Sequence, residues 1–155
     1  MDYVNTGLHH LHNVARWALL IAGIWAIYKA YTGVTGKRSW DASDNKAGMW
    51  FILFCHAQIL VGLILYFYLG QQSIFSNMAE GMKDAETRYW GVEHLFGMII
   101  AVALIQYGRI ASKKATIDIV KHKKALIWYS IGLLLIIINI PWPWRAIGRS
   151  LFPGM

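Results

Sequence analysis

Cysteine and acidic residues are scarce in this sequence. Its 155 residues include one cysteine, Cys55, and only eight aspartates and glutamates. A lone cysteine cannot form an intramolecular disulfide, which excludes the membrane thiol oxidoreductases because they need cysteine pairs. No C-x-x-C-H motif is present, so covalent attachment of a c-type haem is excluded as well. The sequence also lacks a nucleophile triad, a phosphate-binding loop and an H-E-x-x-H motif, so nothing in it supports a hydrolase.

Charged residues are few in total, whereas apolar residues are abundant. The chain is 57% hydrophobic and 15% charged, with a mean hydropathy of +0.40. Soluble domains are about 45–50% apolar and about 25% charged. This composition is typical of an integral membrane protein. Lysine and arginine in cytoplasmic loops then explain the net charge of +7, so we expect contact with a lipid bilayer and no nucleic-acid partner.

Four apolar segments are long enough to cross a bilayer, whose core of about 30 Å needs about 20 helical residues. No repeat, low-complexity tract or soluble domain separates them. The sequence therefore predicts an all-α fold in which residues 1–155 form one transmembrane four-helix bundle. Pro141 and Pro143 should end the last helix, because proline fits poorly inside one. The expected helices span residues 8–32, 48–69, 89–110 and 123–140.

Lysine and arginine are distributed unevenly between the two sides of this bundle. The first and third connections, with the adjoining helix ends, carry most of them, and cytoplasmic loops are enriched in these residues. We therefore expect both termini on the outer, periplasmic side of a bacterial inner membrane. The cytoplasmic set is Lys29, Lys37, Arg38, Lys46, Arg109, Lys113, Lys114, Lys121, Lys123 and Lys124, and the outer set is Lys83, Arg88, Arg145 and Arg149.

Polar residues are drawn into the first helix by its length. Its purely apolar part, residues 17–28, is too short to span a bilayer, so Arg16 and His12 should lie below the outer surface. In the third segment, Glu93 and His94 lie at a similar depth, within about one turn. Both helices run inward from the outside, so we expect these groups to face each other. Ionisable groups inside a membrane are costly and usually mark function.

Two histidines on different helices of a bundle can be the axial ligands of a haem iron. The apolar and aromatic surroundings suit a porphyrin, and an arginine can neutralise a propionate. This pattern predicts an electron-transfer protein with one haem b between the first and third helices near the outer face, which exchanges electrons with quinol. The expected iron ligands are His12 and His94, and the expected cofactor site also includes Arg16 and Glu93.

Five short motifs along nearly the whole chain carry a resemblance to a family. The chain resembles short four-helix bacterial membrane proteins, common in the Bacteroidota, that are labelled cytochrome b-like. The resemblance implies His12 and His94 as the first candidates for haem ligands and His10 and His122 as the next. The motifs are "HLHNVARW" (10–17), "VEHLFGM" (92–98), "YGR" (107–109), "HKKA" (122–125) and "IPWPWR" (140–145).

The sequence is also compatible with two other functions, and it does not decide whether the chain is an enzyme. The first is a cofactor-free accessory subunit of a larger cell-envelope complex, in which His12 and His94 only fix packing and Arg16 pairs with Glu93. The second is a membrane enzyme for a quinone or another small ligand, in which Glu93 and His94 transfer protons.

Two further histidines have different expected environments. His56 lies near the middle of the second helix and points about 160° away from Gln58, so the two should not line one cavity. One of the two then faces a neighbouring chain, a lipid headgroup defect or a second ligand, and this arrangement favours a homo-oligomer or a larger assembly with other membrane proteins. His122, within "KHKK", is expected on a solvated basic face that touches anionic lipid headgroups.

Overall fold

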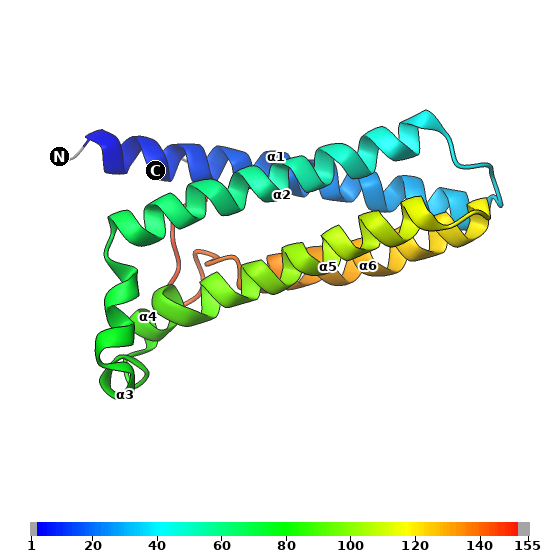
Figure 1. Cartoon of the computed structure of the whole chain (residues 1–155). Coiled ribbons are helices and arrows are strands. Elements are labelled where there is room, and N and C mark those ends of the chain that lie inside the picture. Colours follow the sequence, from blue (N-terminus) through cyan, green and yellow to red (C-terminus); the bar gives the residue numbers. More distant parts are fainter. Residues whose placement is uncertain (1–2, 152–155) are drawn as a thin grey trace.

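The chain forms an all-helical bundle in the computed structural model, which describes residues 3–151. Four helices are long and apolar enough to cross a membrane, and no strand occurs between residues 3 and 151. The predicted all-α class and the four long helices are therefore confirmed. They are α1 (Tyr3–Thr35), α2 (Ala42–Tyr68), α5 (His94–Lys114, continuous with helical turns from Ala85) and α6 (Asp118–Asn139) (Figure 1).

Most of these helices begin earlier than the apolar runs in the sequence predict. α1 begins at Tyr3 instead of residue 8, and α2 at Ala42 instead of residue 48. The start of α2 is fixed by a capping box, in which the Asp41 side chain accepts from the backbone N–H of Asp44 and the Asp44 side chain accepts from that of Asp41. Caps of this kind stabilise a first turn made of polar residues, which hydropathy alone does not include.

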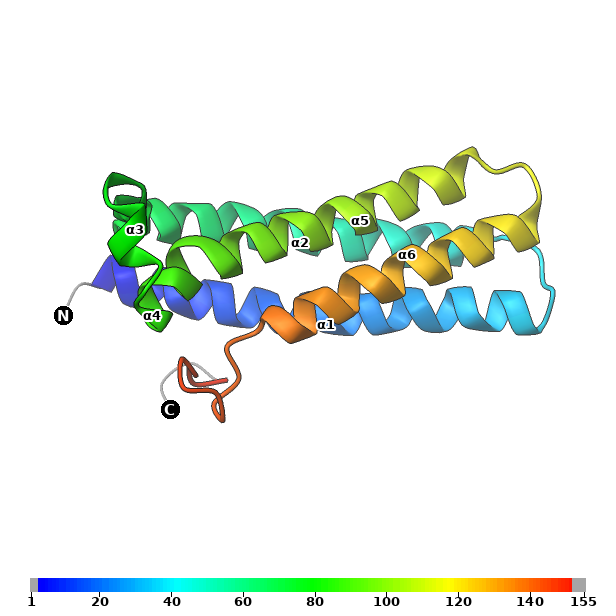
Figure 2. The ribbon, with the colours of Figure 1, turned by 90° about the horizontal axis from the view of Figure 1, so that it is seen from below.

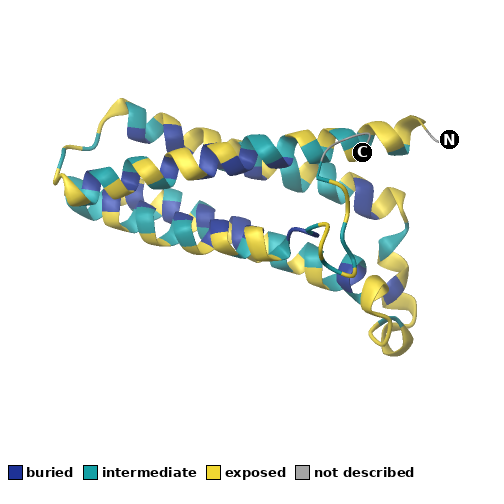
Figure 3. Cartoon of the chain, turned by 180° about the vertical axis from the view of Figure 1, so that it is seen from behind, coloured by how far each residue is buried: buried dark blue, intermediate teal, exposed yellow. Residues whose placement is uncertain are grey.

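The helices form two antiparallel pairs, α1 with α2 and α5 with α6 (Figure 1). α1 also packs against α6, and α2 packs more sparsely against α5, so α1 and α5 lie on a diagonal of the bundle. Buried residues follow the faces where helices meet (Figure 3), and the core includes Leu19, Phe51, Ile105 and Tyr129. Both ends of the described chain lie at the same end of the bundle (Figures 1 and 2).

The bundle end away from the termini is closed by an ion-pair network on the turn between α1 and α2. The Arg38 guanidinium donates to the Asp44 carboxylate, and Lys29 lies 3.7 Å from the same group. The hydrogen bond to Asp44 raises the pKa of Arg38. Arg38 also donates to the Lys29 carbonyl (2.9 Å), so the network ties the end of α1 to the first turn of α2.

His122 lies at this same end, and the expectation that it sits on a solvated basic face is wrong. Its side chain is 0% exposed, and its ring occupies the space where Gly33 of α1 has no Cβ. The Trp40 ring covers it with a centroid distance of 4.9 Å. Only the neighbouring lysines of "KHKK" extend outward, because successive residues on a helix point about 100° apart.

The long connection between α2 and α5 is built from short helical turns. They are η1 (Gln71–Ser76), α3 (Met78–Gly81), α4 (Ala85–Arg88) and η2 (Tyr89–Glu93), and η2 is a π-helical turn. Ile74 of η1 is buried, and its side chain packs against Gly81 and Gly91. Asp84 caps α4 by accepting from Thr87, and this hydrogen bonding lowers the pKa of Asp84.

Candidate functional site

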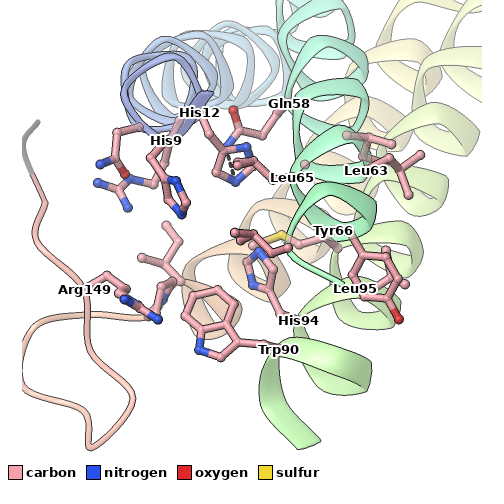
Figure 4. Close-up of a pocket in the computed structure, with 18 of the residues that line it drawn as sticks. His9, His12, Gln58, Leu63, Leu65, Tyr66, Trp90, His94, Leu95 and Arg149 are labelled. Carbon is pink, nitrogen blue, oxygen red and sulfur yellow. Dashed lines mark hydrogen bonds between the residues drawn. The ribbon is translucent and has the colours of Figure 1, made fainter. Parts of the chain in front are cut away.

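A cavity of about 440 Å³ lies at the bundle end that holds both ends of the described chain. Its walls come from α1, α2, α5, α6 and the segment after α6 (Figure 4). Many of its polar side chains come from α1, and the other helices contribute largely apolar residues, with Ile59, Met98, Val102 and Ile136 among them. Its volume is within the range of about 300–1,000 Å³ that is typical of small-molecule sites.

Four of the five predicted site residues line this cavity. His10, His12 and Arg16 enter from α1, and His94 enters from the first turn of α5. His12 and His94 thus meet the same cavity from helices that lie diagonally in the bundle (Figure 4). The sequence predicted similar depths for His12 and His94 near one end of the bundle, and the structure places both at one end.

Glu93 is the predicted site residue that does not line the cavity. It is exposed and accepts a hydrogen bond from Arg88 Nε at 2.7 Å. Because adjacent helical residues point about 100° apart, the neighbour of an inward-pointing His94 faces elsewhere. The expected ion pair of Glu93 with Arg16 is likewise absent among the described residues, where Arg88 is the cation beside this carboxylate.

Two prolines after α6 determine how His94 is held. Asn139 is the last residue of α6, and its carbonyl would ordinarily accept from the N–H four residues later, which Pro143 lacks. The Tyr89 hydroxyl donates to this carbonyl at 2.6 Å, and His94 Nδ1 lies 3.1 Å from it. The "IPWPWR" motif therefore creates an acceptor that fixes the orientation of the imidazole.

The same proline effect is visible two residues earlier on α6. Pro141 removes the N–H that the Ile137 carbonyl would use, and Trp142 Nε1 donates to that carbonyl at 2.8 Å. Arg145 donates to the Ile138 carbonyl at 3.1 Å. The tryptophan and arginine of this motif thus supply donors to the C-terminal carbonyls of α6.

The contacts of His94 determine which of its nitrogens can serve a ligand. A carbonyl oxygen can pair only with a protonated nitrogen, so the neutral ring carries its hydrogen on Nδ1. Its lone pair then lies on Nε2. A backbone carbonyl on one imidazole nitrogen is the arrangement that commonly orients metal-ligating histidines.

His12 is held by α2 on the opposite side of the cavity. Its Nε2 lies 3.1 Å from Gln58 Nε2, and its Nδ1 is buried and has no hydrogen-bond partner among the described residues. Rotation of the Gln58 amide exchanges donor and acceptor, so Gln58 can pair with either tautomer of His12. A Cβ on Gly62 would lie 3.2 Å from His12 Cε1, so this glycine allows the ring its close approach.

The α2 residues that line the cavity are those that the helical spacing in the sequence places on one face. Cys55, Gln58 and Gly62 all line the cavity, whereas His56 is exposed on the other side of the helix. The prediction that His56 and Gln58 do not share a cavity is therefore confirmed.

Arg16 is buried and bonded to the segment that follows α6. Its guanidinium donates to the Leu151 carbonyl at 2.7 Å, and Trp17 Nε1 lies 3.1 Å from the same oxygen. Arg16 therefore neither extends to the outer surface nor pairs with an acidic side chain in the described residues. It leaves a cation on the cavity wall, held by a neutral acceptor.

Several lining residues escaped the sequence analysis because they come from connections. Trp90 belongs to the π-helical turn, and Arg149 follows α6 and lies over the Trp90 ring at 5.2 Å (Figure 4). Arg149 also lies 3.5 Å from Glu86. No sequence pattern signals these two residues, because their positions depend on how the connections pack against the bundle.

The described residues contain no group of three or more histidine, cysteine, aspartate or glutamate side chains placed to hold a metal ion. A site for a bare metal ion that is coordinated only by protein is thus not formed between residues 3 and 151. Haem iron has a smaller requirement, because the porphyrin supplies most of its ligands and the protein supplies the axial ones.

The chain was compared with protein-family models, with curated proteins and with solved structures. No family model, curated protein or solved structure matched it.

Proposed function

We propose that this chain is a four-span protein of a bacterial inner membrane that binds one haem b in the cavity and transfers electrons. The observation that carries the proposal is the placement of His12 and His94, which reach one cavity from two different helices. His94 is oriented by a backbone carbonyl that leaves its Nε2 lone pair for a ligand. His12 brings a buried Nδ1 without a partner among the described residues.

The residues around these histidines fit the group chemically. The apolar lining residues suit a porphyrin face, and Arg16 and Arg149 are cations that can pair with propionates. His10 also lines the cavity, with a buried Nδ1 that has no partner between residues 3 and 151. His12 and His94 would be the axial ligands, and bound haem b would supply one-electron transfer. The chain's own part is to orient the ligands and exclude water.

The orientation in the membrane follows from charge. Lysine and arginine are concentrated at the bundle end opposite the cavity, and this bias supports a cytoplasmic location for that end. The cavity and both termini then lie at the periplasmic side. A haem at this depth could receive electrons from quinol in the membrane and pass them to an acceptor at the outer face.

An absorption spectrum of the detergent-purified protein tests the proposal directly. Expression with adequate haem supply should give a Soret band, and dithionite should sharpen the bands of a six-coordinate haem b. His94→Ala and His12→Ala should each reduce bound haem at least tenfold. His56→Ala is the matched control, because that histidine is exposed on the opposite face of α2.

Two results would reject the proposed haem site. The first is a featureless spectrum of the wild-type protein after haem-replete expression. The second is equal haem content in all three variants. A colourless protein that co-purifies with other envelope proteins would instead favour the accessory-subunit function.

A further inference from the structure

A histidine in the middle of α2 faces away from the bundle. His56 is exposed and lies 14 residues after Ala42 and 12 before Tyr68, or about 21 and 18 Å along the helix. In a bilayer this places the imidazole near the centre of the hydrocarbon core. Among the described residues it has no hydrogen bond, and lipid tails offer neither a donor nor an acceptor.

His56 lies within a continuous stripe of outward-facing residues on α2. The spacing along the stripe is mostly three or four residues in alternation, the pattern of a seam between two paired helices. Around an ideal helix these positions fall within an arc of about 80°. The apolar residues of the stripe are exposed, from 45% for Met49 to 62% for Leu60. The α2 stripe consists of Met49, Leu53, His56, Leu60, Ile64 and Phe67.

We infer that the α2 stripe pairs with the same stripe of a second copy of this chain, and that His56 bonds to its own equivalent. A two-fold axis along the membrane normal brings identical residues together at identical depth. A neutral imidazole has one donor and one acceptor, so two copies can form an N–H···N bond between them. One polar position within an apolar seam also fixes the register of two helices.

The other lipid-facing surfaces of the bundle do not offer this partner. At comparable depth the exposed residues of the remaining helices are apolar, for example Ile21 on α1, Ile100 on α5 and Ile131 on α6. A second copy docked through one of those faces would leave the imidazole unpaired. The symmetric α2 pair is therefore the arrangement between copies that satisfies His56.

The inferred pair does not depend on haem. Gln58 and Gly62 lie on the cavity side of α2, opposite the α2 stripe. Pairing through the stripe leaves both cavities of the dimer open, with no shared residue. The dimer can therefore be tested in protein with or without a ligand.

Cysteine cross-linking in membranes tests the pair while leaving His56 in place. In a Cys55→Ala background, Leu60→Cys should form a disulfide-linked dimer on mild oxidation, because paired stripes bring equivalent residues within disulfide range. Leu134→Cys on α6 is the matched control, because it is the same residue type with similar exposure, 57% against 62%. It should remain monomeric.

Substitution of His56 then tests the hydrogen bond. His56→Leu suits a lipid-facing surface and should not impair folding, yet it should lower the yield of the Leu60→Cys dimer about three- to tenfold, as expected for one interhelical hydrogen bond. His56→Asn keeps a donor and an acceptor and should restore most of that yield. Equal cross-linking at Leu60→Cys and Leu134→Cys, an unchanged yield with His56→Leu, or a cross-link to a different protein would each overturn the inference.

Discussion

Gly33 and His122 are in close contact at the bundle end opposite the cavity. The imidazole of α6 lies where a side chain at position 33 of α1 would be. Both of its nitrogens are buried and have no hydrogen-bond partner among the described residues. An unsatisfied buried polar group costs about 1–3 kcal/mol. Packing of the ring against its neighbours must therefore offset this cost.

Gly33→Ala should therefore destabilise the protein by about 1–3 kcal/mol through overpacking. The measurement is the thermal unfolding midpoint of the detergent-purified protein. Gly7→Ala, in the same helix, is the control, because a Cβ added there would meet nothing within 4 Å outside the local helix backbone. It should be neutral or stabilise by up to about 1 kcal/mol. Equal midpoints for both variants would contradict the close contact of Gly33 with His122.

At the residue scale, the sequence located the principal histidines but not their partners. His12 and His94 were placed at one end because helix length and direction determine depth. Glu93 was assigned to the site by adjacency in sequence, whereas helical phase turns it outward. The contacts of the Asn139 carbonyl with His94 and Tyr89 could not be predicted, because they depend on where α6 ends in space.

The helix ends show how polar residues extend an element beyond its apolar run. α2 begins with a capping box that involves Asp41 and Asp44, and Asp44 also binds Arg38 across the turn. The hydropathy pattern identified four helices correctly, yet it began α2 six residues late. A single sequence gives few signals for such ends, since an aspartate before an apolar run is common in loops as well.

Asp41→Ala should reduce the free energy of unfolding by about 1 kcal/mol, the usual cost of losing a helix cap. Asp44→Ala should cost more, about 1.5–3 kcal/mol, because it also removes charged hydrogen bonds to Arg38. Denaturation in mixed detergent micelles would measure both, with the exposed Ser39→Ala as a neutral reference. The order of the two aspartate variants is the decisive result, and a larger loss for Asp41→Ala would contradict it.

At the scale of the whole molecule, the bundle has two chemically different ends. One end has short connections, and lysine and arginine are frequent in them and in the adjoining helix ends; the other end has the long α2–α5 connection, the cavity and both ends of the described chain. The sequence predicted that the two ends differ in charge. This prediction rests on many residues, so a wrong assignment of one residue does not change it. The closure of the cavity by residues after α6 depends on tertiary contacts and was not predicted.

Labelling from one side of the membrane tests the proposed orientation. In spheroplasts, an impermeant maleimide should label Ser76→Cys in η1 and should not label Thr116→Cys in the α5–α6 connection. Both of these hydroxyl residues are exposed, and the native Cys55 is buried and should stay unlabelled. Permeabilised cells should label both variants. The reverse pattern in spheroplasts would place the termini in the cytoplasm and contradict the charge argument.

The contact of Arg16 and Trp17 with the Leu151 carbonyl has a consequence for biosynthesis. Residues 141–151 follow all four long helices in the sequence, so they are synthesised after every other wall of the cavity. In the proposed haem protein, haem could therefore enter before residues 141–151 dock on α1.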